Sequence, residues 1–475
     1  MRSFIFIFSI FCLLRIAWAA EEVASDQPFL ETEQTETIDL EIETELALEE
    51  SIAEQNEAGT LTAAVDNLGP GAAGFTAEGD IGPDADTMLD PRVLRDFIES
   101  RGLIKCRQKE GNLIIAGDVR ARWTTQGESL NGIKQRGTGT NTALNTFRSE
   151  VNLFLDYTAP KAWVTNKLRW VNYDGSDGGT ATKTETDRAF IGYDIYHCGD
   201  DVDCYIEVGR TRLDYLYESR VEFSTFFDGI HLFYQKKIPT IGQFTIHGGP
   251  FVIDSFTNHY GWAMETFVNR WAGTGFSFKY SIINWNRSAP TLDYGNLTGS
   301  GNVTIANNPR YAFLVSQMLF GYERKIGLPH CKTLYAYAAV LCNHNARPSK
   351  TTNSQKLNNA WYAGFTLGKL CKACDWSLDV IYQSVQAQAV PEFDLAGIGH
   401  GNAANTLLSD AILLGLPPGV VGGFANYRGW EVSFLYAMTD SLSLRAKAAH
   451  STPRDSGIGG DFNYKVFDMS VIFAF

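Results

Sequence analysis

The sequence predicts an all-β fold: a membrane-spanning antiparallel β-barrel of about sixteen strands. Three observations predict it. Runs of about ten residues with alternating apolar and polar side chains fill the chain from residue 111 to its end. The links between these runs alternate between short and long. The last run, Tyr464 to Phe475, has one apolar face and stops on an aromatic residue. A strand has a side-chain period of two, so each run presents an apolar and a mixed face.

Residues 1–20 are predicted to be a secretory signal peptide. Arg2 precedes an apolar run from Phe4 to Leu14, and Ala17-Trp18-Ala19 has the small-x-small form of a cleavage site. The apolar run is too short to span a membrane as a helix.

Residues 21–87 are predicted to form an acidic low-complexity spacer. Residues 21–90 contain 20 Asp or Glu and no Lys or Arg, so the formal net charge of -14 arises from this segment. A segment of high net charge with few aromatic residues cannot bury enough apolar surface to offset its ordering entropy.

Residues 88–104 are expected to form one short amphipathic helix. Asp90 suits the N-cap, Pro91 suits the first turn, and Gly102 can end the helix. Leu94, Phe97 and Ile98 then share one face. This apolar face should dock on the rim or the interior of the barrel that follows.

The barrel is expected to occupy residues 111–475. Spanning strands need about nine to eleven residues, and sixteen runs fit: about 112–125, 145–158, 162–173, 185–197, 204–212, 220–235, 241–253, 259–271, 274–285, 309–325, 332–342, 359–370, 374–388, 427–438, 441–450 and 464–475. Short links should lie at one rim and long links at the other, with both chain ends at the short-link rim. An even number of strands satisfies this pattern.

The charged face of each strand should point into the barrel, because a basic residue facing lipid at mid-bilayer costs about 2–4 kcal/mol. The predicted pore-lining residues are Arg120, Arg122, Arg148, Lys167, Arg169, Arg188, Lys279, Arg445, Lys447, Asp118, Glu150, Asp156 and Glu431. The basic side chains could create a transverse field and a weak anion preference. Alternatively, these charges pair with one another.

The alternating runs, the two kinds of link and the terminal Phe475 resemble a Gram-negative outer-membrane porin over residues 110–475. Residues 90–105, followed by Gly117-Asp118-Val119-Arg120, also resemble the start of porins from chlamydia-like bacteria. The resemblance implies location in the bacterial outer membrane with periplasmic termini. It implies contact with lipid and lipopolysaccharide, and recognition of Phe473 and Phe475 by the barrel assembly machinery. It also implies a homo-oligomer such as a trimer.

The sequence departs from the trimeric general porins in one respect. Those proteins place a long pore-narrowing loop after the fifth strand, where this chain has only about 214–219. The later connection 389–426 contains the apolar stretch 403–416, which should fold into the lumen, cap the mouth or contact a neighbouring subunit.

The first functional hypothesis is a water-filled channel for passive diffusion of small hydrophilic solutes and ions, because a barrel of about sixteen strands leaves an aqueous lumen. The alternatives are a channel specific for a sugar or an anion, and an adhesin or structural envelope protein. A sugar channel would need an aromatic track, for which Phe154, Phe190 and Tyr362 are candidates.

Scattered histidines and the lack of a Gly-x-Ser-x-Gly motif argue against an enzyme. No cofactor, metal or nucleic acid is expected.

Seven cysteines follow the signal peptide, and an oxidising periplasm would favour disulfides. The candidates are Cys106, Cys198, Cys204, Cys331, Cys371 and Cys374. Cys198 and Cys204 could bridge one turn. Cys371 and Cys374 could form a tight bridge, reach separate partners or supply half of a metal site.

Overall fold

A computed structural model gives the structure of the chain. It describes residues 104–108, 111–134, 145–174, 181–198, 202–239, 241–254, 259–285, 313–328, 331–346, 348, 355–391, 394–398, 402–403, 422–423, 425–458 and 460–475. The predicted signal peptide, acidic spacer and amphipathic helix lie outside these residues, except that Ile104 begins a strand.

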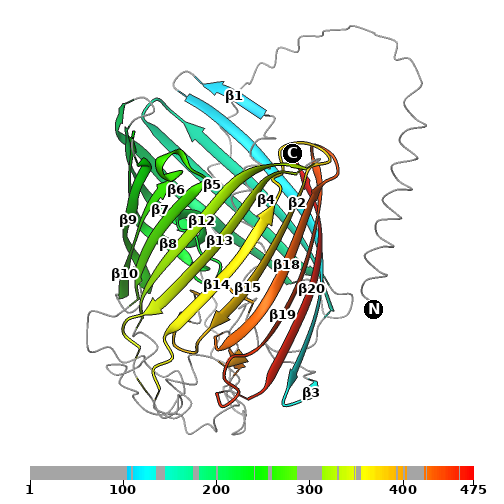
Figure 1. The fold of residues 1–475 in the computed structure, drawn as a ribbon. Coiled ribbons are helices and arrows are strands. Elements are labelled where there is room, and N and C mark those ends of the chain that lie inside the picture. The colour runs from blue at the N-terminus through cyan, green and yellow to red at the C-terminus, as the bar shows by residue number, and fades with distance from the viewer. Residues whose placement is uncertain are drawn as a thin grey trace, which may run out of the picture. The chain divides into compact units, whose positions relative to one another are not determined.

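Sixteen strands close into one antiparallel barrel, which confirms the predicted fold (Figure 1). Each strand pairs with the next, and the last pairs with the first, Asp118 opposite Ala474 and Leu130 opposite Phe462. The strands are β2 (Gly111–Leu130), β4 (Asn145–Thr158), β5 (Ala162–Asp174), β6 (Ala181–Cys198), β7 (Val202–Arg212), β8 (Phe226–Ile238), β9 (Gly242–Asp254), β10 (His259–Asn269), β11 (Phe276–Asn284), β12 (Leu314–Leu328), β13 (Cys331–Asn343), β14 (Asn359–Leu367), β15 (Trp376–Val385), β18 (Tyr427–Ala437), β19 (Leu442–Pro453) and β20 (Phe462–Ala474).

Two short strands extend the sheet at β2. The strand β1 (Ile104–Gln108) forms a hairpin with the start of β2, Ile104 opposite Ile115. The strand β3 (Ile133–Lys134) folds back on the end of β2. A separate pair joins β16 (Asn402–Ala403) to β17 (Gly422–Gly423).

The two rims differ as the link lengths predict. The rim that carries the C-terminus has short links, such as 159–161 between β4 and β5 and 438–441 between β18 and β19. The opposite rim has the longer links, including 285–313 and 386–426. We call the first the C-terminal rim and the second the loop rim; β1 and the C-terminus lie together in Figure 1. Among the described residues, no helix is long and apolar enough to cross a membrane.

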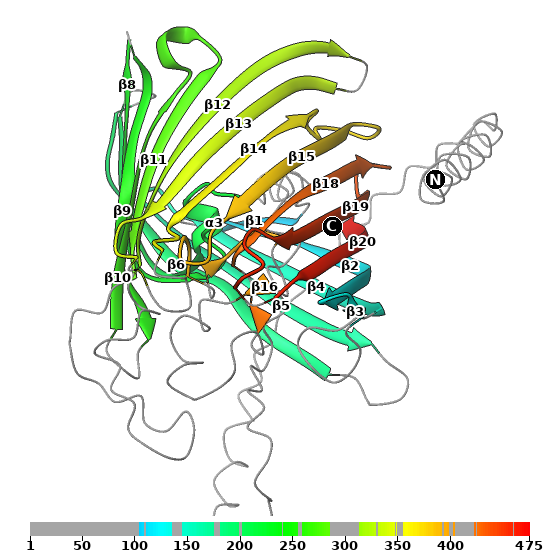
Figure 2. The same cartoon turned by 60° about the horizontal axis from the view of Figure 1, so that its bottom comes forward.

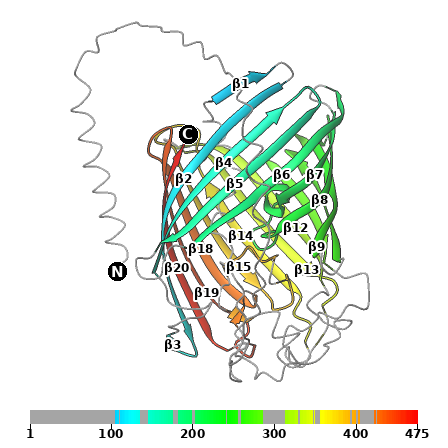
Figure 3. The same ribbon diagram turned by 180° about the vertical axis from the view of Figure 1, so that it is seen from behind.

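The outer wall is apolar and the inner wall is polar, because successive side chains of a strand point to opposite sides of the sheet. In β20 the side chains of Phe473 and Phe475 are exposed, whereas Asp468 and Ser470 are buried. Buried and partly buried residues alternate without a break along β19. The strands wrap continuously around the barrel when it is seen from behind (Figure 3).

The largest buried apolar cluster lies inside the barrel. The connection between β7 and β8 contains the short helix α3 (Leu213–Leu216), which sits within the ring of strands (Figures 2 and 3). Leu213, Tyr217 and Phe223 from this connection pack with Leu395 and Ile398 from the connection between β15 and β18. Two connections therefore fold inward and meet in the lumen.

Candidate functional site

The candidate site is the lumen of the barrel, where the sequence places thirteen charged side chains. All thirteen lie on the face of the sheet opposite the exposed apolar residues. Ten are buried and three are partly buried. The buried ones are Asp118, Arg120, Arg148, Glu150, Lys167, Arg169, Arg188, Glu431, Arg445 and Lys447, and the partly buried ones are Arg122, Asp156 and Lys279.

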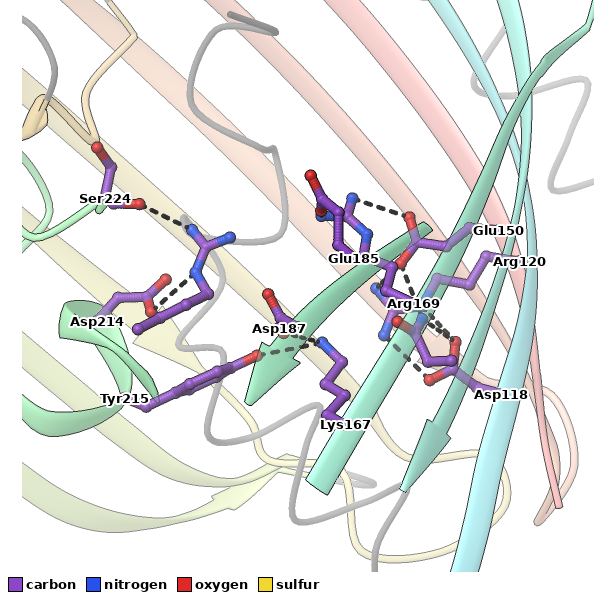
Figure 4. Close-up of polar contacts among 12 residues, drawn as sticks. Asp118, Arg120, Glu150, Lys167, Arg169, Glu185, Asp187, Asp214, Tyr215 and Ser224 are labelled. Carbon is purple, nitrogen blue, oxygen red and sulfur yellow. Dashed lines mark hydrogen bonds and ion pairs between the residues drawn. The ribbon is translucent and has the colours of Figure 1, made fainter. Parts of the chain in front are cut away.

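Many of these charges pair with one another, so the pairing alternative holds for the wall formed by β2, β4, β5 and β6 (Figure 4). Glu150 accepts hydrogen bonds from Arg148 and Arg169, each at 3.1 Å. The Nε of Arg120 lies 2.5 Å from the Oδ1 of Asp118. Alternation along each strand puts these side chains on one face, and strand pairing sets them side by side. The result is a continuous ionic network rather than a row of isolated cations.

Other ion pairs continue around the inner wall. Arg122 on β2 pairs with Asp468 on β20, across the closing seam. Lys447 on β19 lies 2.9 Å from Glu431 on β18. Each pair keeps a buried carboxylate next to a cation, which offsets the cost of removing both from water.

The connection between β7 and β8, residues 213–225, is the first inward segment. The predicted connection, about 214–219, is too short, because residues 220–225 have the alternation of a strand. The expectation that this chain lacks a long loop after the fifth strand is therefore wrong. Its residues Leu213, Tyr217, Val221 and Phe223 are buried. Alternation in 220–225 reflects burial inside the lumen and not a place in the sheet.

The first inward segment begins beside the inner wall formed by β5 and β6. Lys167 donates a hydrogen bond to Asp187 at 2.6 Å and lies 3.4 Å from the hydroxyl of Tyr215 on α3. The guanidinium carbon of Arg188 lies 4.3 Å from the centre of the Tyr215 ring, a cation–π contact. Figure 4 shows Lys167, Asp187 and Tyr215 facing one another.

The same segment reaches the opposite wall. The amide of Gln317 on β12 donates to the carbonyl of Glu218 at 2.7 Å, and its oxygen accepts from Ser219 at 2.7 Å. Gln383 on β15 donates to the carbonyl of Arg220 at 2.9 Å. The segment therefore crosses the lumen, from β5 and β6 to β12 and β15, and narrows it.

The second inward segment is 386–398, of which 386–391 and 394–398 are described. Val390, Leu395 and Ile398 are buried in the lumen. This places the start of the long connection 389–426 inside the barrel. The apolar stretch 403–416 lies outside the described residues except for Ala403. Its inward folding stays a prediction.

Sequence reasoning missed a chain of four side chains across β7, β8, β9 and β10. A ring nitrogen of His231 lies 3.2 Å from Glu207, and the other lies 3.1 Å from His247. The remaining ring nitrogen of His247 lies 3.3 Å from Glu265. The two histidines are 16 residues apart, so only the strand register could have brought them together.

The aromatic track predicted for a sugar channel also differs from the one in the structure. Phe154 and Tyr362 are buried and cannot stack on a solute, whereas the third candidate, Phe190, is partly exposed. A partly exposed row lies elsewhere on the inner face, where the Tyr205 ring stacks on Phe233 at 4.4 Å and meets Trp163 edge-on at 5.4 Å.

The structure shows neither of the two disulfides suggested for the turns, Cys198–Cys204 and Cys371–Cys374, and both stay predictions. Cys204 and Cys374 are free thiols. Cys204 lies opposite Tyr196 and not opposite Cys198. Residues in such a diagonal relation are about 7–8 Å apart, whereas a disulfide needs Cα atoms about 4.4–6.8 Å apart.

The turn that carries Cys374 has its own support, since the Asp375 carboxylate accepts hydrogen bonds from the backbone of Cys371 and Lys372 at 3.0 Å each. The side chains of Cys106, Cys198 and Cys331 are not among those that the structure describes. Their bonding stays a prediction.

No protein-family model matches the chain, and no curated protein matches it. Solved structures that resemble it are outer-membrane barrels. OmpF of Salmonella typhi, in complex with daunomycin, is 11% identical with a TM-score of 0.44, and the match covers 78% of this chain and 100% of that one. The outer membrane channel DcaP of Acinetobacter baumannii is 12% identical with a TM-score of 0.42, covering 78% and 100%. Pseudomonas putida OprB at high pH is 10% identical with a TM-score of 0.43, covering 77% and 94%.

Proposed function

We propose that the chain is an outer-membrane porin: a channel through which small hydrophilic solutes and ions diffuse, with a weak anion preference. The observation that carries this proposal is the closed barrel of sixteen strands, apolar outside and charged inside, with a segment crossing its lumen. A barrel of this size is wide enough for an aqueous channel. Pore width, wall charge and the inward segments would then decide which solutes pass.

The proposed anion preference rests on the wall that faces α3. Arg120, Arg148, Lys167, Arg169 and Arg188 lie on neighbouring strands there and outnumber Asp118, Glu150 and Asp187, the buried carboxylates that pair with members of this set. Carboxylates of the first inward segment and of the opposite wall, such as Glu218 and Asp379, lie across the lumen. Opposed charges of this kind create a transverse field that orients and selects ions. Reversal potentials across a KCl gradient in planar bilayers test the proposal, and clear cation preference would contradict it.

Lys167→Gln is expected to move the reversal potential toward cation preference while leaving the barrel folded. Lys167 lies 3.4 Å from the hydroxyl of Tyr215 on α3, and Arg169 and Arg212 still act on the Asp187 carboxylate after its loss. Lys372→Gln, in an exposed turn at the C-terminal rim, makes the same charge change away from the lumen and should leave selectivity as it was. Equal shifts in the two variants would mean that Lys167 has no special place in selection.

A channel specific for a sugar is the second candidate, favoured by the aromatic row of Trp163, Tyr205 and Phe233. Glu207 accepts a hydrogen bond from the Trp163 indole at 3.3 Å, so a hydrogen-bonding group lies beside the rings. Concentration-dependent block of the ionic current by a sugar would support this candidate. A current that no sugar blocks would leave general diffusion.

The barrel's surroundings follow from the same proposal. The apolar outer wall would contact outer-membrane lipid and lipopolysaccharide. The barrel assembly machinery would recognise the strand ending in Phe473 and Phe475, and both chain ends would face the periplasm. The exposed apolar side chains of the outer wall support the proposed contact with lipid. Protease accessibility in intact cells would test the orientation of the chain ends.

A homo-oligomer, which we also propose, is supported by polar groups on the outer wall. Arg210 on β7 and Asp228 on β8 lie opposite each other and form a bidentate ion pair at 2.7 and 2.8 Å. Their side chains are 44% and 36% exposed. They lie two residues from the outward apolar residues Val208 and Ile230, on the same face of the sheet. A charge pair facing lipid is unfavourable, so a second copy of this chain would cover it better than lipid does.

Replacing Arg210 and Asp228 together by Leu is expected to shift the protein toward the monomer, because the wall then suits lipid. Native mass spectrometry of the detergent-extracted protein measures the distribution. Val208→Leu, an apolar change on the same face, serves as the control and should keep the wild-type distribution. A wild-type protein that is already monomeric, or a double variant that remains oligomeric, would argue against this interface.

A further inference from the structure

The two inward segments are joined by one buried carboxylate. The Oδ2 of Asp394 accepts a hydrogen bond from the backbone of Phe223 at 3.2 Å. Its Oδ1 accepts from the backbone and the hydroxyl of Thr225, at 3.2 and 2.9 Å. Two backbone bonds add to these, from Ser224 to the Asp394 carbonyl at 3.3 Å and from Ala396 to Val221 at 2.8 Å. Asp394 has an exposed fraction of 0%.

The turn that Asp394 holds is strained. Phe223 has a φ of 78°, in the left-handed region. A bulky aromatic residue seldom adopts this conformation and needs its surroundings to enforce it. The Phe223 ring is buried, with its centre 5.2 Å from that of Tyr217. If the hydrogen bonds that Phe223 and Thr225 donate to Asp394 were lost, the turn could relax to an unstrained conformation.

A second carboxyl group, Glu222, is buried beside the first. Its exposed fraction is 1%, and its Oε1 has no hydrogen-bond partner among the described residues. Burial, and then the Asp394 carboxylate, raise the pKa of Glu222 well above its usual range. Burial also raises the pKa of Asp394, to about 7, although the hydrogen bonds from Thr225 and Phe223 oppose the rise. Asp394 accepts three hydrogen bonds at its carboxylate, so it is the first of the two to ionise as the pH rises. Glu222 is therefore the group that keeps a proton.

The other charged groups near the pair do not cancel this arrangement. Asp214 on α3 adds a like charge that acts on Asp394. Arg212, at the end of β7, donates hydrogen bonds to the Asp214 carboxylate at 3.2 Å and to the carbonyl of Ser224 at 3.3 Å. Arg220, on the same segment as Glu222, lies over the Tyr337 ring at 5.2 Å. The surrounding cations thus have contacts of their own, while the Asp394 carboxylate acts on Glu222.

We propose that Asp394 and Glu222 form a pH-sensitive lock between the two inward segments, and that this lock sets the width of the channel. While Glu222 is protonated, Asp394 holds the turn at Phe223 and the first inward segment stays across the lumen. When Glu222 loses its proton, two buried carboxylates repel each other and the turn is released. The proposal rests on the proposed function, because it concerns the constriction of that channel.

The direction of the pH effect follows from the raised pKa. A carboxyl group that is harder to ionise in the docked segment than in a released one binds its proton more tightly when docked. Docking is therefore strongest below the ordinary pKa of a glutamate, about 4.3. It weakens as the pH rises toward the higher pKa of the docked state. The channel should widen toward alkaline pH.

Single-channel conductance from about pH 5 to about pH 9 tests the lock, with intact protein in planar bilayers. We expect the wild-type conductance to rise with pH. Glu222→Gln, which stays neutral, should remain narrow at every pH. Asp394→Leu, which has no acceptor oxygens, should be wide at every pH. Glu323→Gln, at an exposed site near the C-terminal rim, is the control and should follow the wild-type profile. A pH profile that survives in Glu222→Gln would overturn the proposal.

Amide hydrogen exchange separates the lock from the channel. In the same protein, the protection factors of the Phe223 and Thr225 amides should fall by about tenfold or more from acidic to alkaline pH, the change that one pKa unit of coupling produces. Glu222→Gln should abolish that fall. If the wild type does not conduct but the protection still falls, the proposed channel function is wrong and the proposed lock between the segments stands. If the wild type conducts and the protection does not change, the proposed lock is wrong.

Discussion

Removal of residues 462–475, which are β20 and the terminal Phe475, is expected to abolish assembly of the barrel, so that no folded protein reaches the membrane. This strand pairs with β19 on one side and with β2 on the other. Without it, two strand edges would face lipid with unpaired N–H and C=O groups, each costing several kcal/mol. Heat-modifiable migration of the membrane fraction on gels, which reports folded barrels, measures the effect.

A point change at the seam tests the same closure more finely. Gly117 exchanges two backbone hydrogen bonds with Phe475, each at 2.9 Å. A Cβ at Gly117 would lie 2.6 Å from the Phe475 ring and 2.8 Å from the carbonyl of Asn152. Gly117→Val should therefore impair assembly strongly. Gly127→Val on the same strand meets nothing within 4 Å and is the matched control. Normal folding of Gly117→Val would show that the terminal residue is dispensable for closure.

Replacement of residues 217–224 by a short Gly-Ser turn is expected to raise single-channel conductance by about twofold or more, since these residues cross the lumen and pore width governs conductance. Their outer ends, near Arg212 and Phe226, lie on neighbouring strands and can be joined by a short turn. Conductance in 1 M salt, compared with the wild type, measures the effect.

The matched control for this deletion shortens a connection at the C-terminal rim instead. Removal of Lys372 and Ala373, in the exposed turn between β14 and β15, takes chain from outside the lumen. It should leave conductance unchanged. An unaltered conductance in the 217–224 variant would mean that the segment does not form the constriction.

Most of the wall could be predicted because its signal is local. Lipid on one side and water or ion pairs on the other impose a period of two on every strand, as in Trp430 to Tyr436 of β18. Link length then fixes which ends share a rim. The position of the seam, which the Arg122–Asp468 ion pair crosses, could also be predicted, because closure must join the first strand to the last.

The contents of the lumen could not be predicted in the same way. Residues 220–225 alternate like a strand, but they are buried by contacts with Asp394 and Gln383, which are more than 160 positions away in the chain. The contact between His231 and His247 depends on register across one hairpin, and a slip of one residue would turn either side chain toward lipid. Cys204 shows the same limit, since its neighbour across the turn is decided by the register.

The hairpin of β1 has a consequence for the seam. On that side of β2, β20 covers residues 118–130, and β1 covers 111–115. The start of the described chain thus occupies the stretch of edge that the last strand leaves open beyond Phe475. An uncovered edge can template pairing with another chain. By folding back on β2, residues 104–108 cover this edge and prevent a strand of another chain from pairing with it where the barrel closes.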